Sequence, residues 1–223
     1  MEKIIDGIKY RLDEETLTAE VIDYEDEGRE GKIKILETIE ISGISYRVTS
    51  IGAEAFRNCD SLISVDIPNS VTSIEIGAFM ACFSLTNITI SNGVTSIGMM
   101  AFCFCSSLTD ITIPNSVISI GNNAFSNCDS LTSITIGNRV KSIGERAFEG
   151  CTSLTNISIP DSVKSIGAKA FKLCFSLTDI CYRGTMEQWD EITLGEDWNT
   201  GSEVEDIHCT DGDFYGSVWK TIE

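Results

Sequence analysis

The fold class that this sequence predicts is a solenoid, a stack of similar coils that share one core. A phrase of 23 residues is written six times between residues 48 and 185 without insertion or deletion. Every copy has Ala-Phe at its eighth and ninth places, Cys at its twelfth and Ser-Leu at its fourteenth and fifteenth. Because coils that share a core have no boundary between them, residues 1–223 are predicted to form one domain. The copies begin at Val48, Val71, Val94, Val117, Val140 and Val163.

Each repeat predicts a strand, a bend and an outer turn. The pattern L-x-x-I-x-I directs side chains inward from a short strand, and V-x-S-I forms a second extended step. The Gly that follows in five copies is the expected residue for a bend with positive φ, whereas the second copy has Glu75 there and Gly77 two residues later. The segment x-x-A-F-x-x-C is expected to form a short helical turn that buries Ala, Phe and Cys. The predicted result is a right-handed, curved, mainly β stack of six coils.

The N-terminal segment, residues 1–47, is expected to cover one end of the core as a β-hairpin cap. Apolar residues alternate with charged ones at Ile8, Tyr10 and Leu12, which predicts a strand with one buried face. The apolar run from Ile33 to Ile41 reaches Ser42-Gly43, a turn signal, and predicts a hairpin that leads straight into the first repeat.

The C-terminal segment, residues 186–223, is expected to be a helix and strand cap. Thr185 and Gln188 have the spacing of a capping box, which predicts a short helix that lays Trp189 over the last coil. A strand is expected around Val204–Cys209, followed by a last strand or tail near Tyr215–Ile222.

The formal net charge of −18 is unevenly placed. The N-terminal segment, the repeats and the C-terminal segment carry −6, −2 and −10. Such a field repels phosphate backbones, so nucleic acid is not an expected partner, and anionic membrane surfaces are disfavoured for the same reason. No stretch approaches the roughly 18 apolar residues that a membrane helix needs, so membrane insertion is not expected. The repeats themselves are nearly neutral.

Six of the nine cysteines occupy one repeat position, and no CxxC pair is present. A position shared by every coil forms a ladder, in which free Cys packs as a small apolar residue. Neighbouring strands lie about 4.8 Å apart, so spacing alone does not exclude disulfides. Buried free thiols are the prediction for the ladder. Reactivity is expected instead at the three other cysteines: Cys103, Cys181 and Cys209.

The repeat LxxIxIPxSVxSIGxxAFxxCxSLTxITIP resembles that of the BspA-like leucine-rich repeat family, which is also described from treponemal surface proteins. Gly43 to Gly52 resembles the segment that leads into the repeats of that family, and Tyr182–Trp189 with His208–Gly212 is similar to its usual ending. The resemblance covers the whole chain. It implies a leucine-rich repeat solenoid found in bacterial surface proteins, some of which are adhesins.

No catalytic residue and no cofactor or metal is expected. The single histidine, His208, would have to serve any Ser-His-Asp or Cys-His arrangement, and Cys209 beside it points to the opposite face of a strand. Asp206, Asp211 and Asp213 leave open a site for a hard cation, although the full EF-hand pattern is absent. A hydrolase that uses His208 remains the alternative of a different class.

A candidate binding surface lies at the seventeenth and nineteenth places of the repeats, which point outward from the predicted strands. Stacked strands would turn these places into a concave polar surface that recognises a protein or a glycan, or into a merely solvated Ser/Thr face. On the outer side, Phe83 and Phe175 are expected to be buried as extra packing. The candidate partner-binding residues are Asp66, Asn87, Thr89, Asp110, Thr112, Ser133, Thr135, Asn156 and Ser158.

The function that these features favour is a non-catalytic protein-interaction or adhesion module, expected to be a monomer. The alternative is a structural spacer that self-associates or has no specific ligand. The N-terminal sequence lacks the apolar region of a signal peptide. Localisation is therefore left open between an intracellular protein and a secreted or surface protein whose leader is not part of this sequence.

Overall fold

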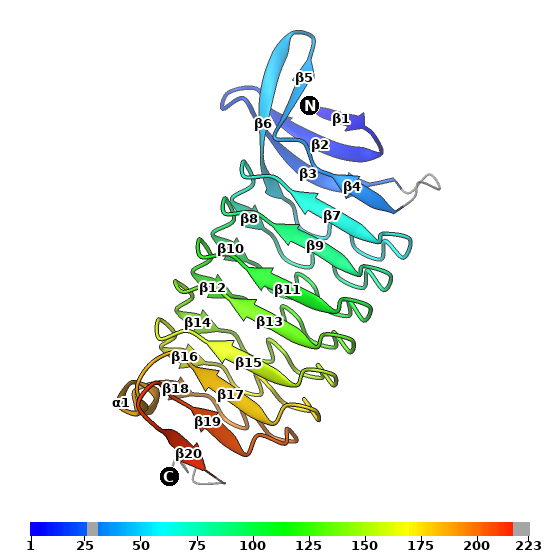
Figure 1. Ribbon diagram of the computed structural model, residues 1–223. Coiled ribbons are helices and arrows are strands. Elements are labelled where there is room, and N and C mark those ends of the chain that lie inside the picture. The colour runs from blue at the N-terminus through cyan, green and yellow to red at the C-terminus, as the bar shows by residue number, and fades with distance from the viewer. Residues whose placement is uncertain (26–30, 216–223) are drawn as a thin grey trace.

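The computed structural model describes residues 1–25 and 31–215 and is a stack of coils with two sheets running along its length (Figure 1). One sheet, here called the back sheet, has 11 strands; the other, here called the front sheet, is divided into groups of three and six strands. A single hydrophobic cluster extends from Ile8 to Ile207 between them. The predicted solenoid is confirmed.

The front sheet is made by the L-x-x-I-x-I phrase of each repeat. Its isoleucines point inward and are buried, and Pro68, Pro114 and Pro160 end three of its strands, as expected for a residue without an N–H. Among the described residues no ladder joins β9 to β11, which divides the sheet. The strands are β4 (Lys32–Lys34), β7 (Ser64–Ile67), β9 (Asn87–Ile90), β11 (Asp110–Ile113), β13 (Ser133–Ile136), β15 (Asn156–Ile159), β17 (Asp179–Tyr182), β19 (Asp206–His208) and β20 (Asp213–Tyr215).

The back sheet continues the N-terminal strands with one short strand per coil, from the V-x-S-I step. Its repeat strands pair in parallel with Ser opposite Ser and Ile opposite Ile, so the 23-residue period is also the register. These strands are β8 (Ser73–Ile74), β10 (Ser96–Ile97), β12 (Ser119–Ile120), β14 (Ser142–Ile143) and β16 (Ser165–Ile166); β18 (Thr193–Leu194), which follows the repeats, pairs Thr193 with Ser165 and Leu194 with Ile166.

The predicted helical turns in the A-F-x-x-C segments are wrong. In the first coil the N–H groups of Ala55 and Arg57 bond to carbonyls three residues earlier, whereas that of Phe56 bonds to Ala78 of the next coil. Glu54 and Asn58 have positive φ, at 59° and 60°. A segment that contains two left-handed residues four places apart cannot be a continuous right-handed helix. The segment is therefore a chain of tight turns bonded from coil to coil, and it still buries Ala and Phe as predicted.

The repeat glycines are needed for a different reason from the one the sequence suggested. Gly98 and Gly121 do not have positive φ. A Cβ built on Gly121 would lie 2.6 Å from the carbonyl carbon of Gly98 in the preceding coil, closer than any real contact. The glycine therefore permits close approach between coils. The second copy, with Glu75 at the glycine place, is not displaced: its positive φ falls at Gly77 (61°), the same seventh place that has positive φ at Glu54 and Met100 in the neighbouring copies.

The N-terminal segment covers the first coil with antiparallel strands. It comprises β1 (Glu2–Ile5), β2 (Ile8–Asp13) and β3 (Thr18–Tyr24), and β3 pairs in parallel with β6 (Ile44–Ile51). The predicted hairpin is present as β5 (Thr38–Ile41) and β6, turning through Ser42 and Gly43, both with positive φ.

Ile33 does not belong to this hairpin. It lies in β4, which pairs with β7 and so extends the front sheet by one strand beyond the first repeat.

The C-terminal segment contains a seventh turn of the solenoid, which six repeats alone did not predict. β18 pairs with β16, and β19 pairs with β17, both in parallel. The extra residues of this coil form α1 (Met186–Asp190), which begins with the predicted capping box between Thr185 and Gln188. Trp189 is buried against Tyr182, with ring centroids 5.2 Å apart. The part of the predicted last segment after Tyr215 lies outside the described residues.

The centre of the core is a column of six stacked phenylalanine rings. Neighbouring centroids are 4.9 to 5.5 Å apart and the rings are within 8° of parallel. Tyr24 covers one end of the column and Trp198 the other, edge-on to Phe171. The column is formed by Phe56, Phe79, Phe102, Phe125, Phe148 and Phe171.

Candidate functional site

The outward side chains of the front sheet form two parallel rows, which together are called the front face. Eight of the nine candidate residues are exposed, and Ser158 is partly buried. Their register is regular, for instance Asp110 opposite Ser133 and Thr112 opposite Thr135. One row holds Asn87, Asp110, Ser133 and Asn156; the other holds Asp66, Thr89, Thr112, Thr135 and Ser158. The structure therefore brings the nine side chains onto one surface.

The front face changes in chemical character along its length. At its N-terminal end, β4 adds Lys32 and Lys34, which lie opposite Ser64 and Asp66. The middle strands present mostly hydroxyl and amide groups, with one carboxylate at Asp110 on β11. At the C-terminal end, β17 and β19 add carboxylates and an imidazole to the same rows. The face thus carries lysines at one end and a cluster of carboxylates at the other, with a mostly uncharged centre.

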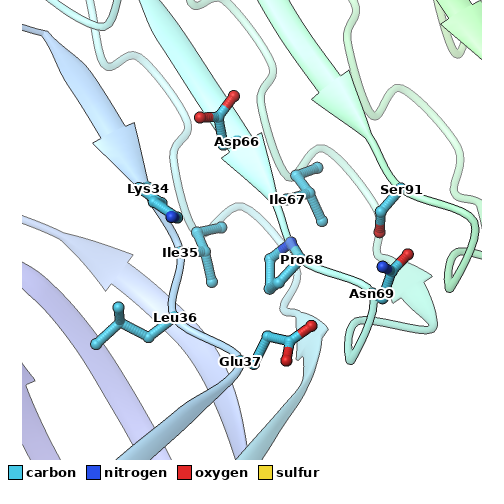
Figure 2. A pocket seen from close by; sticks show the side chains of 9 residues that line it. All are labelled: Lys34, Ile35, Leu36, Glu37, Asp66, Ile67, Pro68, Asn69 and Ser91. Atoms are coloured by element: carbon cyan, nitrogen blue, oxygen red, sulfur yellow. The ribbon is translucent and has the colours of Figure 1, made fainter.

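A pocket of about 470 Å³ lies at the N-terminal end of the front face (Figure 2). Its wall is formed where β4 and β7 end, with Lys34 and Asp66 on neighbouring strands and Glu37 and Asn69 on the loops that follow. Ile67 and Pro68 supply apolar lining. The volume is in the range of small-molecule sites, which bury most of a ligand's surface. This pocket offers charged groups of both signs at its mouth.

The C-terminal end holds the densest group of ionisable side chains on the front face. His208 lies between two carboxylates, with Nε2 at 3.2 Å from Asp179 Oδ1 and Nδ1 at 3.0 Å from Asp213 Oδ1. Asp206 is the register partner of Asp179 on the adjacent strand. Like charges directly opposite one another on neighbouring strands are destabilising, so a positive group is needed beside this pair.

These contacts shift the acid–base equilibria of both partners. Hydrogen bonds with Asp179 and then Asp213 raise the pKa of His208 above its ordinary value. A hydrogen bond from Thr178, followed by that with His208, lowers the pKa of Asp179. The directions agree, because each group stabilises the charged form of the other.

Asp211 does not join this cluster. Its Oδ1 accepts a hydrogen bond of 2.9 Å from the backbone N–H of Met186, at the start of α1. Thr210 binds the carbonyl of Gly184 through its N–H and its hydroxyl. Hydrogen bonds therefore join the His208–Gly212 ending to the Tyr182–Trp189 segment. In the sequence these two stretches were associated only through their resemblance to the family's usual ending. The contact with Met186 gives Asp211 a structural role, and the cation site at the Asp211–Asp213 turn stays a hypothesis.

The cysteine ladder consists of free thiols, as predicted. Each thiol from Cys82 onward donates to a Phe carbonyl of the preceding coil, for example Cys128 to Phe102 at 3.2 Å. Burial raises the pKa of Cys105 to about 12 and also holds that of Cys128 well above its ordinary value. Thiols that do not ionise are poor nucleophiles and poor metal ligands.

Of the three cysteines off the ladder, only Cys181 fits the expectation of an accessible thiol. It is exposed on the front face, opposite His208. Cys103 is buried, and burial raises its pKa. Burial likewise raises the pKa of Cys209 to about 11. Burial disfavours the expected reactivity of Cys103, and the reactivity of the half-buried Cys209 stays a prediction.

Aromatic residues are exposed where the sequence led us to expect burial. Phe83 is 47% exposed and Phe175 is 54% exposed. Phe104, on the next coil, is also exposed, although it precedes the ladder cysteine of its coil whereas Phe83 follows its own. The segments that hold Phe83 and Phe104 lead into β9 and β11.

The association of Asp179 with His208 was missed by sequence reasoning. The signal was present, because Asp206-Ile-His208 repeats the x-I-x strand phrase of Asp110-Ile-Thr112 and Asp179-Ile-Cys181. It was hidden by the spacing, which is 27 residues from Asp179 to Asp206 instead of 23. Lys32 and Lys34 were missed for a similar reason, since β4 precedes the repeats.

Known proteins resemble this chain in sequence and in structure. The family model for the BspA type leucine rich repeat region matches with six copies, over residues 33–128 and 72–195. A leucine-rich repeat protein of T. pallidum has a TM-score of 0.75 and 27% identity, with 90% of this chain and 91% of that chain covered. Among curated proteins, none matches.

Two further crystal structures extend the comparison. A leucine rich cell surface protein from Faecalibacterium prausnitzii has a TM-score of 0.61 and 35% identity, with 82% of this chain and 54% of that chain covered. A leucine-rich repeat protein from Bacteroides ovatus has a TM-score of 0.59 and 21% identity, with 94% and 71% covered, and shares the fold. In the part of this chain that the structure describes, no helix has the length and apolar character to span a membrane.

Proposed function

Because this chain belongs to the BspA type leucine-rich repeat family, we propose that it is a non-catalytic protein-interaction module whose partner binds along the front face. The observation that carries the proposal is the pair of polar rows on this face, which occupy the same repeat places on both sides of the break between β9 and β11. Its two rows run from β4 to β19 with polar side chains that point outward from a rigid, fully packed core. Such a surface can hold an extended partner without rearrangement, which reduces the entropic cost of binding.

The different charges at the two ends of the front face would orient a bound partner. Lys32 and Lys34 lie at one end of the face, and Asp179 and Asp206 at the other. A partner with acidic groups at one end and basic groups at the other would bind in a single direction, because the reversed complex brings like charges together. A glycan lacks such paired charges, so the charge difference favours a protein over a glycan.

The exposed phenylalanines would supply affinity that the small polar residues of the front face lack. Interface hot spots are enriched in aromatic residues and Arg, whereas Ser and Thr contribute little. Phe83 and Phe104 are exposed on the segments that lead into β9 and β11. A partner that covers these rings and also Thr89 and Thr112 would bury apolar area and satisfy the polar rows together.

The experiment that tests this function is a binding assay with a blocked face. Purified protein is immobilised, proteins from bacterial and host mucosal extracts are captured, and the captured set is compared between wild type and Thr112→Arg/Thr135→Arg. Both threonines are exposed at neighbouring positions of one row, so two Arg side chains would obstruct it without disturbing the core. Loss of a specific partner is expected.

A matched control is Thr72→Arg/Thr95→Arg, which makes the same change at two exposed threonines beside the back sheet. This variant is expected to retain the partner. Equal capture by all three proteins would refute binding through the centre of the front face. Loss in the control but not in the face variant would place the contact on the other side.

A location on the cell surface forms part of this proposal. It is supported by the F. prausnitzii relative, which is described as a cell surface protein. Antibody labelling of intact cells tests it, with permeabilised cells as the reference. Labelling that requires permeabilisation would contradict a surface location.

A further inference from the structure

Three side chains of kinds that bind metal ions meet at the C-terminal end of the front face. Asp179 comes from β17, and Asp206 and His208 from β19. Each offers one ligand atom, and these atoms all lie within 4.8 Å of one another. Asp179 Oδ1 and His208 Nε2 are 3.2 Å apart. A tetrahedral ion with bonds of about 2.0–2.1 Å holds its ligands about 3.3 Å from each other, so this pair already has the required spacing.

The backbone fixes these donors. Asp179 and Asp206 are direct register partners in a parallel ladder, and His208 is two residues further along the same strand, so all three point to the same side of the sheet. The pairing forces two carboxylates together on neighbouring strands. A cation between them removes the repulsion that this arrangement otherwise causes.

Asp213 supports His208 from behind. It belongs to β20, and its Oδ1 accepts from His208 Nδ1 at 3.0 Å. An imidazole that binds a metal ion characteristically donates its other N–H to a carboxylate, which fixes the tautomer and the plane of the ring. With Nδ1–H directed to Asp213, the Nε2 atom faces Asp179, where the metal ion would lie.

We propose that Asp179, Asp206 and His208 form a binding site for a divalent late first-row metal ion such as Zn²⁺, with Asp213 as the residue that orients His208. The imidazole nitrogen favours such an ion over Ca²⁺ and Mg²⁺, which take oxygen ligands. Three protein ligands on an open face leave a coordination position for water or for a side chain of a bound partner. The site does not depend on the proposed function.

The single histidine of the chain gives a direct readout. Protein without a histidine tag is titrated with Zn²⁺ while the ring nitrogens of His208 are followed by NMR, and affinity is measured by calorimetry. Cys181 is exposed opposite His208, so both measurements use a Cys181→Ser background to exclude binding by this thiol. A saturable one-to-one isotherm is expected, with the larger shift at Nε2 and the Nδ1–H retained.

Substitutions distinguish coordination of Zn²⁺ by these side chains from nonspecific attraction of the cation to an acidic protein. His208→Gln and Asp206→Asn are expected to abolish the isotherm, and Asp213→Asn to weaken it about 10–100-fold. Asp129→Asn removes an exposed carboxylate away from the cluster and is expected to bind as wild type does. An unperturbed imidazole at saturating Zn²⁺ would overturn the proposal. So would equal weakening by Asp129→Asn and Asp206→Asn, or Ca²⁺ binding as tightly as Zn²⁺.

Discussion

The repeated coils and the last coil are built on the same two sheets but use their side chains differently. In the repeated coils every place stacks on its equivalent 23 residues away, so core residues form ladders and the exposed rows are mostly small and polar. In the last coil Asp206 lies 27 residues after Asp179, and the added length forms α1. Its exposed places carry Asp and His. Ionisable side chains thus cluster in the coil that departs from the 23-residue repeat.

The physical reason lies in stacking itself. Residues at one repeat place lie opposite each other on neighbouring strands, where like charges repel and apolar or hydroxyl side chains pair well. A charged side chain copied into every coil would therefore accumulate repulsion along the face. Phe, Cys and Ile can therefore occupy the same core place in every coil. A cluster of charged side chains instead needs a coil whose sequence differs from its neighbours, so that opposite charges lie side by side.

The largest expected effect of a substitution is in the repeated coils. Phe102 is fully buried between Phe79 and Phe125 in the aromatic column. Phe102→Ala is expected to lower the free energy of unfolding by about 3–5 kcal/mol, because it removes a large apolar side chain and leaves a cavity. Urea denaturation measures this. The control is Phe104→Ala two residues away, where the ring is 46% exposed and a change within about 0.5 kcal/mol is expected. Similar losses in both would contradict the assignment of the column.

The thiols offer a second contrast between the two regions. In the native protein a thiol reagent is expected to modify Cys181 rapidly, because it is exposed. Cys128 and the ladder thiols that are likewise 0% exposed (Cys82, Cys105, Cys151 and Cys174) react only when the chain opens, whereas Cys59, at the start of the ladder, is half-buried. The number of thiols modified with time measures this, and Cys181→Ser is expected to remove the rapid phase. Rapid modification of Cys103 would contradict its buried position.

A smaller effect is expected at the start of α1. Gln188 N–H donates to Thr185 Oγ1 at 3.2 Å, and Thr185 N–H donates to Gln188 Oε1 at 2.9 Å. Thr185→Ala removes the hydroxyl and is expected to cost about 1 kcal/mol of stability. Thr185→Ser keeps a capping oxygen and is expected to restore most of it. If Ser and Ala destabilise the protein equally, the capping bond is not the cause.

Sequence reasoning reached the features that repetition encodes and missed those that depend on contacts between coils. The Phe column, the Cys ladder and the two exposed rows follow from one phrase, because a residue at a fixed place has the same surroundings in every coil. The conformation of the turns did not follow, since positive φ at Glu54 and Asn58 is set by hydrogen bonds to the next coil. The cluster around His208 did not follow either, because the changed spacing concealed its register with Asp179.

The smallest expected effect on stability comes from His208 in the last coil, and it is measured in the absence of metal ions. Hydrogen bonds with Asp179 and Asp213 raise the pKa of His208, so NMR titration with a chelator present is expected to place this pKa above the ordinary value of about 6.5. Asp179→Asn and Asp213→Asn should each lower it. A raised pKa in the folded state means that the charged pair stabilises the fold below the unfolded pKa, and that this contribution disappears as pH rises through the folded pKa. The imidazole is exposed, so the loss of stability is small and the titration is the sensitive measurement. A pKa at or below the ordinary value would show that Asp179 and Asp213 do not hold the ring.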